Sequence, residues 1–208
     1  MSVVNILDRV TEWARQSICS KIKLKLPPKD EESATDQDYE YDLVTPAAFT
    51  MYVPTRDKLP PDVRSPIPSI CVRCRDGEDD LAASRGRINI EFCFSAWNPG
   101  TYGADVLRPI EGNSTEARRW NGPEANDHFQ RYGGGYRDVW NFVEIALREI
   151  ESRTHIDGIE VDRTVPVRYG PLAEQESIPD FYPLWFAWVS FTLTYPLIRY
   201  DADVENLL

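Results

Sequence analysis

Two cysteines three positions apart form the pattern in this chain that most resembles a metal site. Cys71 and Cys74 lie in the segment ICVRCR. A pair of thiolates can hold zinc when a second pair of ligands lies close by. However, the alternation of apolar and basic residues indicates a β-strand, in which positions three apart point to opposite faces. We therefore expect no metal here, and with Cys19 and Cys93 we expect four reduced structural thiols.

Groups that could act as acids, bases or nucleophiles are also few. The chain has two histidines, His128 and His155, and neither lies in a ligand pattern such as HExxH. There is no GxSxG motif for an activated serine. The segment GGGYR at 133–137 lacks the lysine and hydroxyl residue of a phosphate-binding loop, so a hinge is the simpler interpretation. The adjacent acids Asp79 and Asp80 are predicted to lie in a solvated turn. We expect no enzyme and no cofactor.

The net charge of −11 is concentrated in two segments. Residues 29–42 carry a net charge of −6 and residues 201–208 a net charge of −3, which leaves about −2 for the rest. Phosphate contacts dominate nucleic-acid affinity, so this chain is not expected to read DNA through a basic face. The acidic segments are predicted to be solvated loops, surfaces that repel DNA, or segments that order on a partner.

Targeting signals are not evident either. No run reaches the roughly 18–20 apolar residues that span a bilayer. The segment MSVVNILDRVTEW carries acidic and polar residues where a signal peptide has a basic start and an apolar stretch. We expect a protein that is made and kept in a cytoplasm.

Hydrophobic periodicity predicts the elements that position these residues. One helix is expected over residues 3–19 with Ser2 as its N-cap, and a second over 138–152 with Asp138 as its N-cap. Strands are expected over residues 22–26, 48–53, 69–75, 87–97, 159–168 and 184–196.

These elements predict an α+β fold. We expect an antiparallel sheet of about four to five strands, with both helices packed on it. One domain is predicted to span residues 1–208, with long excursions at 27–64 and 98–137 and a short acidic tail at 201–208. The last strand is apolar on both faces, so it is expected to be central or to lie under a partner.

Aromatic residues flank or occupy the Gly-rich excursion, where a solvent-exposed loop would have little use for them. They are Trp97, Tyr102, Trp120, Phe129, Tyr132 and Tyr136. Trp and Tyr are enriched at protein interfaces. One interpretation therefore places these side chains against a neighbouring subunit, and the other buries them in the chain's own core.

Three segments resemble, in this order, the tail terminator proteins of tailed bacteriophages, also described as tail completion or minor tail proteins. The segments are PIPSICVRCRDGEDDLAASRGRINIEFCFSAWNPGTYG, YRDVWNFVEIALREIE and PDFYPLWFAWVSFTLTYP. With the first helix, the resemblance covers about 60% of the chain. The excursions at 27–64 and 104–135 depart from the compact pattern of the family.

The resemblance implies a homo-oligomeric ring, commonly of six subunits, in the tail or neck of a virion assembled in the host cytoplasm. Such a ring caps the tail tube, stops polymerisation of the tube protein and offers the surface to which the head-side connector docks. DNA passes through its channel without specific binding. For the channel wall, the candidate acids of this chain are Asp76, Glu78, Asp79 and Asp80.

Two rival interpretations stay open. The first is a head-closure or neck connector protein of the same virion. The second is a small ligand-binding or enzymatic α+β domain that uses the Gly-rich excursion as a lid. The scarcity of histidine and the lack of a nucleophile motif count against the second.

Overall fold

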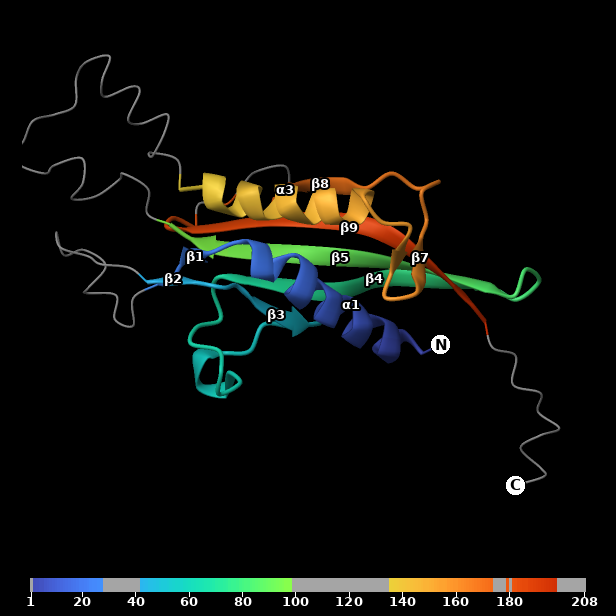
Figure 1. Ribbon diagram of the computed structural model, residues 1–208, viewed down its shortest axis with the longest axis horizontal. Helices are drawn as coiled ribbons and strands as arrows, with labels where there is room; N and C mark the ends of the chain where they lie inside the picture. Colours follow the sequence, from blue (N-terminus) through green and yellow to red (C-terminus); the bar gives the residue numbers. More distant parts are fainter. Residues whose placement is uncertain (1, 28–41, 99–134, 174–178, 180, 198–208) are drawn as a thin grey trace, which may run out of the picture.

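The fold is taken from a computed structural model, which describes residues 2–27, 42–98, 135–173, 179 and 181–197 (Figure 1). Its α-helices are α1 (Val3–Ser17) and α3 (Arg137–Glu151), and short 3-10 turns lie at Cys19–Lys21 and Arg56–Lys58. The strands are β1 (Leu24–Lys25), β2 (Leu43–Val44), β3 (Ala47–Thr50), β4 (Ser69–Asp80), β5 (Arg85–Trp97), β6 (His155–Ile156), β7 (Ile159–Val161), β8 (Arg168–Pro171) and β9 (Leu184–Pro196).

One mixed sheet of seven strands forms the body of the described protein. Its order is β3-β4-β5-β9-β7-β6, and β8 also pairs with β9. β3 runs parallel to β4, whereas every other pair in the sheet is antiparallel. The predicted α+β class is therefore confirmed, but the prediction of about four to five antiparallel strands is wrong. The additional strands have two to four residues, too few to show a periodic pattern.

Three long strands make the centre of this sheet. β5 pairs with β9 without interruption from Arg85↔Pro196 to Trp97↔Leu184, and with β4 from Ser69↔Ser95 to Asp80↔Arg85. β9 therefore lies between β5 and the short strands β7 and β8, which confirms its predicted central place. On one face of the sheet β9 is buried from Ala187 to Tyr195, whereas Phe186 and Trp188 on the other face are only partly buried.

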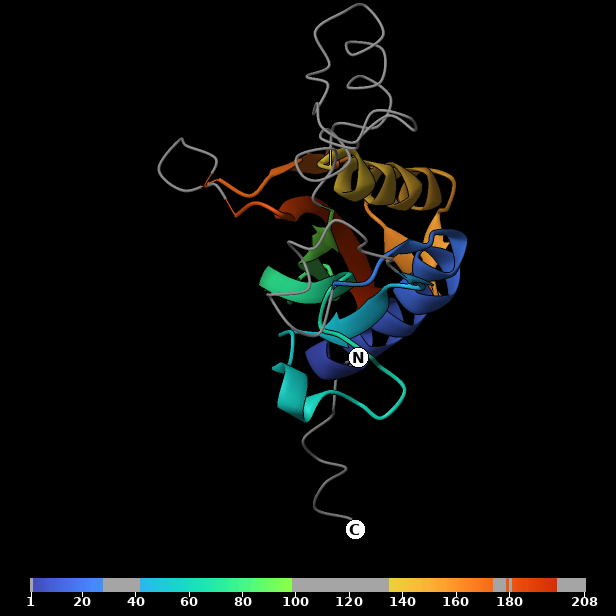
Figure 2. The same cartoon turned by 90° about the vertical axis from the view of Figure 1, so that its left-hand side faces the viewer.

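Both helices cover the same face of the sheet, as Figure 2 shows. α1 packs on β3 and β4, and α3 packs on β5 and β9. The ring of Phe142 on α3 meets that of Phe94 on β5 edge to face at 4.9 Å and joins the two layers. Within the sheet, Phe92 meets Phe191 in the same way at 5.0 Å. No helix of the described chain lies on the opposite face, which we call the open face.

The helix boundaries follow from local hydrogen bonds. Ser2 caps α1 as predicted, because its hydroxyl accepts a hydrogen bond from the backbone N–H of Asn5 at 3.2 Å. The helix predicted over 138–152, α3, begins and ends one residue earlier, and its predicted N-cap, Asp138, is wrong by two residues. Tyr136 is its N-cap and makes no side-chain capping bond, and Asp138 lies inside the first turn.

Three strand predictions also need correction. β4 continues to Asp80, so Asp79 and Asp80 lie in a strand and not in the turn. The strand expected over 159–168 is two strands, β7 and β8, separated by a turn in which Asp162 accepts hydrogen bonds from Thr164. The strand expected over 48–53 is β3, which ends at Thr50 because Met51 has a left-handed backbone (φ 67°).

Candidate interaction surface

A buried asparagine joins the elements at one end of the sheet. Asn98 follows β5 directly, and its side-chain amide donates to Asp138 on α3 at 2.7 Å and accepts from the Lys25 ammonium at 3.0 Å. Its backbone carbonyl accepts from the indole N–H of Trp185 on β9 at 2.7 Å. Burial raises the pKa of Asp138, and the hydrogen bond from Asn98 only partly offsets this effect. We call this group the Asn98 junction.

Gly135 completes the Asn98 junction. A Cβ atom at this position would lie 2.1 Å from the Asn98 carbonyl oxygen and 2.8 Å from the Trp185 indole nitrogen. Only a glycine allows the chain to enter α3 this close to the end of β5. The junction therefore fixes where α3 begins and where Tyr136 and Trp185 lie.

An aromatic surface lies beside the Asn98 junction, formed by the start of α3 and the two sides of the β8–β9 connection. Its exposed members have between 40% and 56% of their area exposed, and they are Tyr136, Tyr169, Leu172, Phe181 and Tyr182. Three partly buried rings, Trp140, Trp185 and Phe186, lie beneath them. We call this set the aromatic surface.

Ring contacts hold the aromatic surface in place. Trp185 meets Tyr136 edge to face at 6.1 Å and Tyr182 at 6.4 Å. Phe181 meets Phe186 at 5.5 Å. A cavity of about 440 Å³ opens between these rings, with Leu172 and Pro179 on its wall. Edge-to-face rings are favourable pairs, so these side chains have fixed positions and are suited to contact another protein.

The aromatic residues predicted for an interface divide into three groups. Tyr136 belongs to the aromatic surface. Trp97 is only 4% exposed and is a core residue of this chain. The other predicted residues, Tyr102, Trp120, Phe129 and Tyr132, lie outside the described residues. The sequence prediction missed Tyr169, Leu172, Phe181 and Tyr182. The signal for Phe181 and Tyr182 was the Pro-bounded aromatic run PDFYPLWF, which leads into β9, and no comparable run marks Tyr169 or Leu172.

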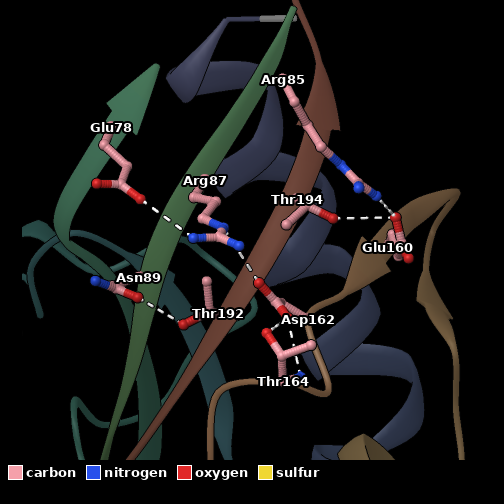
Figure 3. A network of polar contacts seen from close by, with 9 residues as sticks. All are labelled: Glu78, Arg85, Arg87, Asn89, Glu160, Asp162, Thr164, Thr192 and Thr194. Carbon is pink, nitrogen blue, oxygen red and sulfur yellow. Dashed lines mark hydrogen bonds and ion pairs between the residues drawn. The ribbon is translucent and has the colours of Figure 1, made fainter. Parts of the chain in front are cut away.

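The open face carries a polar network near the β4–β5 turn (Figure 3). Arg87 lies between Glu78, at 3.5 Å, and Asp162, at 3.3 Å. Arg85 pairs with Glu160, which also accepts a hydrogen bond from Thr194 at 3.1 Å.

Asp162 is the best-held carboxylate of this network. Its side chain is 6% exposed and accepts hydrogen bonds from the Thr164 hydroxyl at 2.5 Å and the Thr164 backbone N–H at 3.0 Å. These bonds and the nearby arginines lower its pKa. The group therefore stays ionised at neutral pH, as a structural charge and not as a proton donor.

The four candidate channel acids have separate structural roles. Asp76 accepts a hydrogen bond from Asn89, and Glu78 is the partner of Arg87. Asp79 accepts from the Tyr195 hydroxyl at 3.0 Å, and Asp80 accepts from the backbone N–H of Ala83 at 2.9 Å. All four are exposed on one projecting hairpin, and whether they face a channel stays a prediction.

The thiols show no reactive arrangement. All four cysteines are free, as the sequence predicted. Burial raises the pKa of Cys19 and of Cys93 to about 12, and burial also raises that of Cys71 although Arg73 lies beside it. A thiol is a nucleophile or metal ligand only when deprotonated. These groups therefore act as small packing residues at neutral pH.

The described part of the chain offers neither a metal site nor a membrane-spanning helix. Its His, Cys, Asp and Glu residues form no group of three or more placed to hold a metal ion. Its helices include none with the length and apolar character to cross a membrane.

No family model matches the sequence, and no curated protein matches it.

Proposed function

We propose that this protein is a tail terminator of a tailed bacteriophage, a structural protein whose copies form a ring, with six subunits as the expected number. The ring would cap the tail tube, stop its polymerisation and offer the docking surface for the head-side connector. The resemblance of the three sequence segments supports this proposal, and so does the α+β sheet with its helices on one face.

The aromatic surface is the observation that carries the proposal. Covering an exposed aromatic or leucine side chain contributes on the order of 1.5–3 kcal/mol. The five exposed members are roughly half exposed, so covering all of them would contribute on the order of 3–7 kcal/mol. Micromolar binding needs about 8 kcal/mol. Association itself costs roughly 4–15 kcal/mol in lost freedom of motion, so this surface can supply one part of the protein–protein interface that a ring subunit requires.

The length of tails assembled without this protein tests the proposal. A tail terminator predicts tubes that grow past their normal length and do not join heads. Tails of normal length that still join heads would rule the function out. Tails of normal length that stay separate from heads would instead favour the alternative, a head-closure or neck connector.

A further inference from the structure

The turn that joins β4 to β5 has an unusual composition for an exposed tip. It reads Leu81-Ala82-Ala83-Ser84, whereas exposed turns favour Gly, Asn, Asp, Pro and Ser. The Leu81 side chain is 75% exposed. The hairpin projects beyond both helices, at the right-hand end of Figure 1. We call residues 78–84 the tip.

Side chains hold the tip in one shape. Asp80 accepts a hydrogen bond from the Ala83 backbone N–H at 2.9 Å, and Ser84 closes the turn with a left-handed backbone (φ 51°). The Ser84 carbonyl accepts from the backbone N–H of Leu197, next to β9, at 3.0 Å. A preorganised projection loses little conformational entropy when it binds.

The open face contains a cavity of about 640 Å³ on the same strands, toward their other end. Trp188 and Phe186 of β9 and Cys93 of β5 line it, with Ile67 and Leu172 at its sides. We call this cavity the socket. It is larger than a leucine side chain needs and has room for several residues of a turn.

The aromatic lining of the socket is fixed. The indole N–H of Trp188 donates to the Pro171 carbonyl at 3.0 Å. Gly170 of β8, the register partner of Trp188, leaves room for the ring, since a Cβ there would approach it to 3.2 Å. The socket is therefore preformed in the single chain.

Charge distinguishes the two ends of the hairpin. One row of register partners across the open face reads Arg168 (β8), Ser190 (β9), Glu91 (β5) and Arg73 (β4), with Arg73 and Glu91 on the socket wall. The charges of Arg73 and Glu91 cancel on the socket wall, and Arg168, at the β8 end of the row, gives the row its net charge of +1. The tip contains Glu78, Asp79 and Asp80 and no basic residue.

We propose that the tip of one copy inserts into the socket of the next copy, with Leu81 among the apolar side chains and Asp80 beside Arg73. This inference rests on the proposed function, in which copies of the chain form a ring, and names the contact between them. Leu81 of the tip and Cys71 of the socket are ten residues apart in the sequence, which corresponds to about 30 Å at the rise of a strand. Different surfaces meet in such a contact, so it is head-to-tail, and it generates a ring when the rotation between neighbouring copies closes.

Photo-crosslinking tests the contact directly. The full-length variant Leu81→p-benzoylphenylalanine is prepared with and without ¹⁵N label, and an equal mixture of the two is irradiated. Crosslinked peptides are then identified by mass spectrometry. We expect mixed-isotope crosslinks from position 81 to the segments that line the socket. The matched control is Val4→p-benzoylphenylalanine, at an apolar residue 67% exposed at the start of α1. It should give no crosslink to the socket.

A second measurement follows self-association by sedimentation. Leu81→Asp should weaken it roughly tenfold or more, whereas Val4→Asp should leave it unchanged. Thermal unfolding of both variants shows that they are folded. Crosslinks from position 81 to another tip, a protein that stays monomeric into the millimolar range, or a small molecule bound in the socket of a monomer would each overturn the contact.

The failure of this contact and the failure of the proposed function give different results. A ring that sits on the tail tube but crosslinks elsewhere would overturn the contact and leave the function standing. Crosslinks at the socket in a protein whose loss leaves tails normal would establish the contact and overturn the function.

Discussion

The Asn98 junction makes a prediction about how the aromatic surface is held. In Asn98→Ala the Asp138 carboxylate keeps its partly buried position and loses the amide that donates to it at 2.7 Å. A hydrogen bond to a charged group contributes about 1.5–3 kcal/mol. We therefore expect the free energy of unfolding to fall by about 2 kcal/mol at pH 7. The backbone bond from Trp185 to the carbonyl of residue 98 is retained.

The stability lost in Asn98→Ala should become smaller as the pH falls. Because burial raises the pKa of Asp138, the native state binds this proton more tightly than the unfolded chain does. The native state is therefore relatively more stable below the ordinary Asp pKa, about 3.9, and that advantage is lost as pH rises through the folded pKa. Removing the Asn98 amide raises the folded pKa further. The cost of Asn98→Ala should thus be largest at pH 7 and shrink to about 1 kcal/mol at about pH 3, below the ordinary Asp pKa, where the carboxyl is protonated and a neutral hydrogen bond is lost.

Urea denaturation followed by tryptophan fluorescence measures the free energy of unfolding at both pH values. The control is Asp138→Asn, which keeps the shape of the side chain and has no charge at either pH. In that background Asn98→Ala should cost the same at pH 7 and at about pH 3. An equal penalty at both pH values in the Asp138 background would refute the assigned bond.

Four further changes test other parts of the fold and surface by urea denaturation or sedimentation. Phe142→Ala should cost about 3–5 kcal/mol, and a cost below 1 kcal/mol would contradict its place between α3 and the sheet. Gly86→Ala should cost about 1–3 kcal/mol, because a Cβ there would lie 2.4 Å from the Tyr195 ring; a neutral result would contradict this packing. Asp162→Asn should cost about 1.5–3 kcal/mol at pH 7. Because the pKa of Asp162 is lowered in the folded protein, this stability is present above the ordinary Asp pKa and is lost as the pH falls through the folded pKa. A cost that grows at low pH would contradict this assignment. Phe181→Ser with Tyr182→Ser should weaken self-association and lower the free energy of unfolding by about 1–3 kcal/mol, because each ring also makes an edge-to-face contact within the chain. Tyr52→Ser, at a residue that is 68% exposed away from the aromatic surface, should leave association unchanged.

The long elements could be predicted from the sequence because each has one strong period. The even-numbered residues from Ile88 to Phe94 in β5 are buried toward the helices as predicted, and the odd-numbered residues face the other side. The end of β4 was different. Its segment DGEDD has the composition of a turn, yet it forms a strand because every residue from Asp76 to Asp80 pairs with β5. Pairing with a strong neighbouring strand overrides local propensity.

The surface could be predicted only in part, because exposure depends on tertiary contacts. Trp97 and Tyr136 looked equivalent in the sequence, both beside the Gly-rich excursion, but one is buried and the other exposed. The socket combines residues of five separate segments, and no local pattern marks it. The tip is different, since a leucine and two alanines in a turn are visible in the sequence itself.

The position of this protein in an assembled phage particle tests the central claim most directly. Electron microscopy of the neck should show a ring of copies seated on the last ring of the tail tube, below the head-side connector. Copies located only on the head side of that connector, or particles that contain no copy at all, would contradict the account.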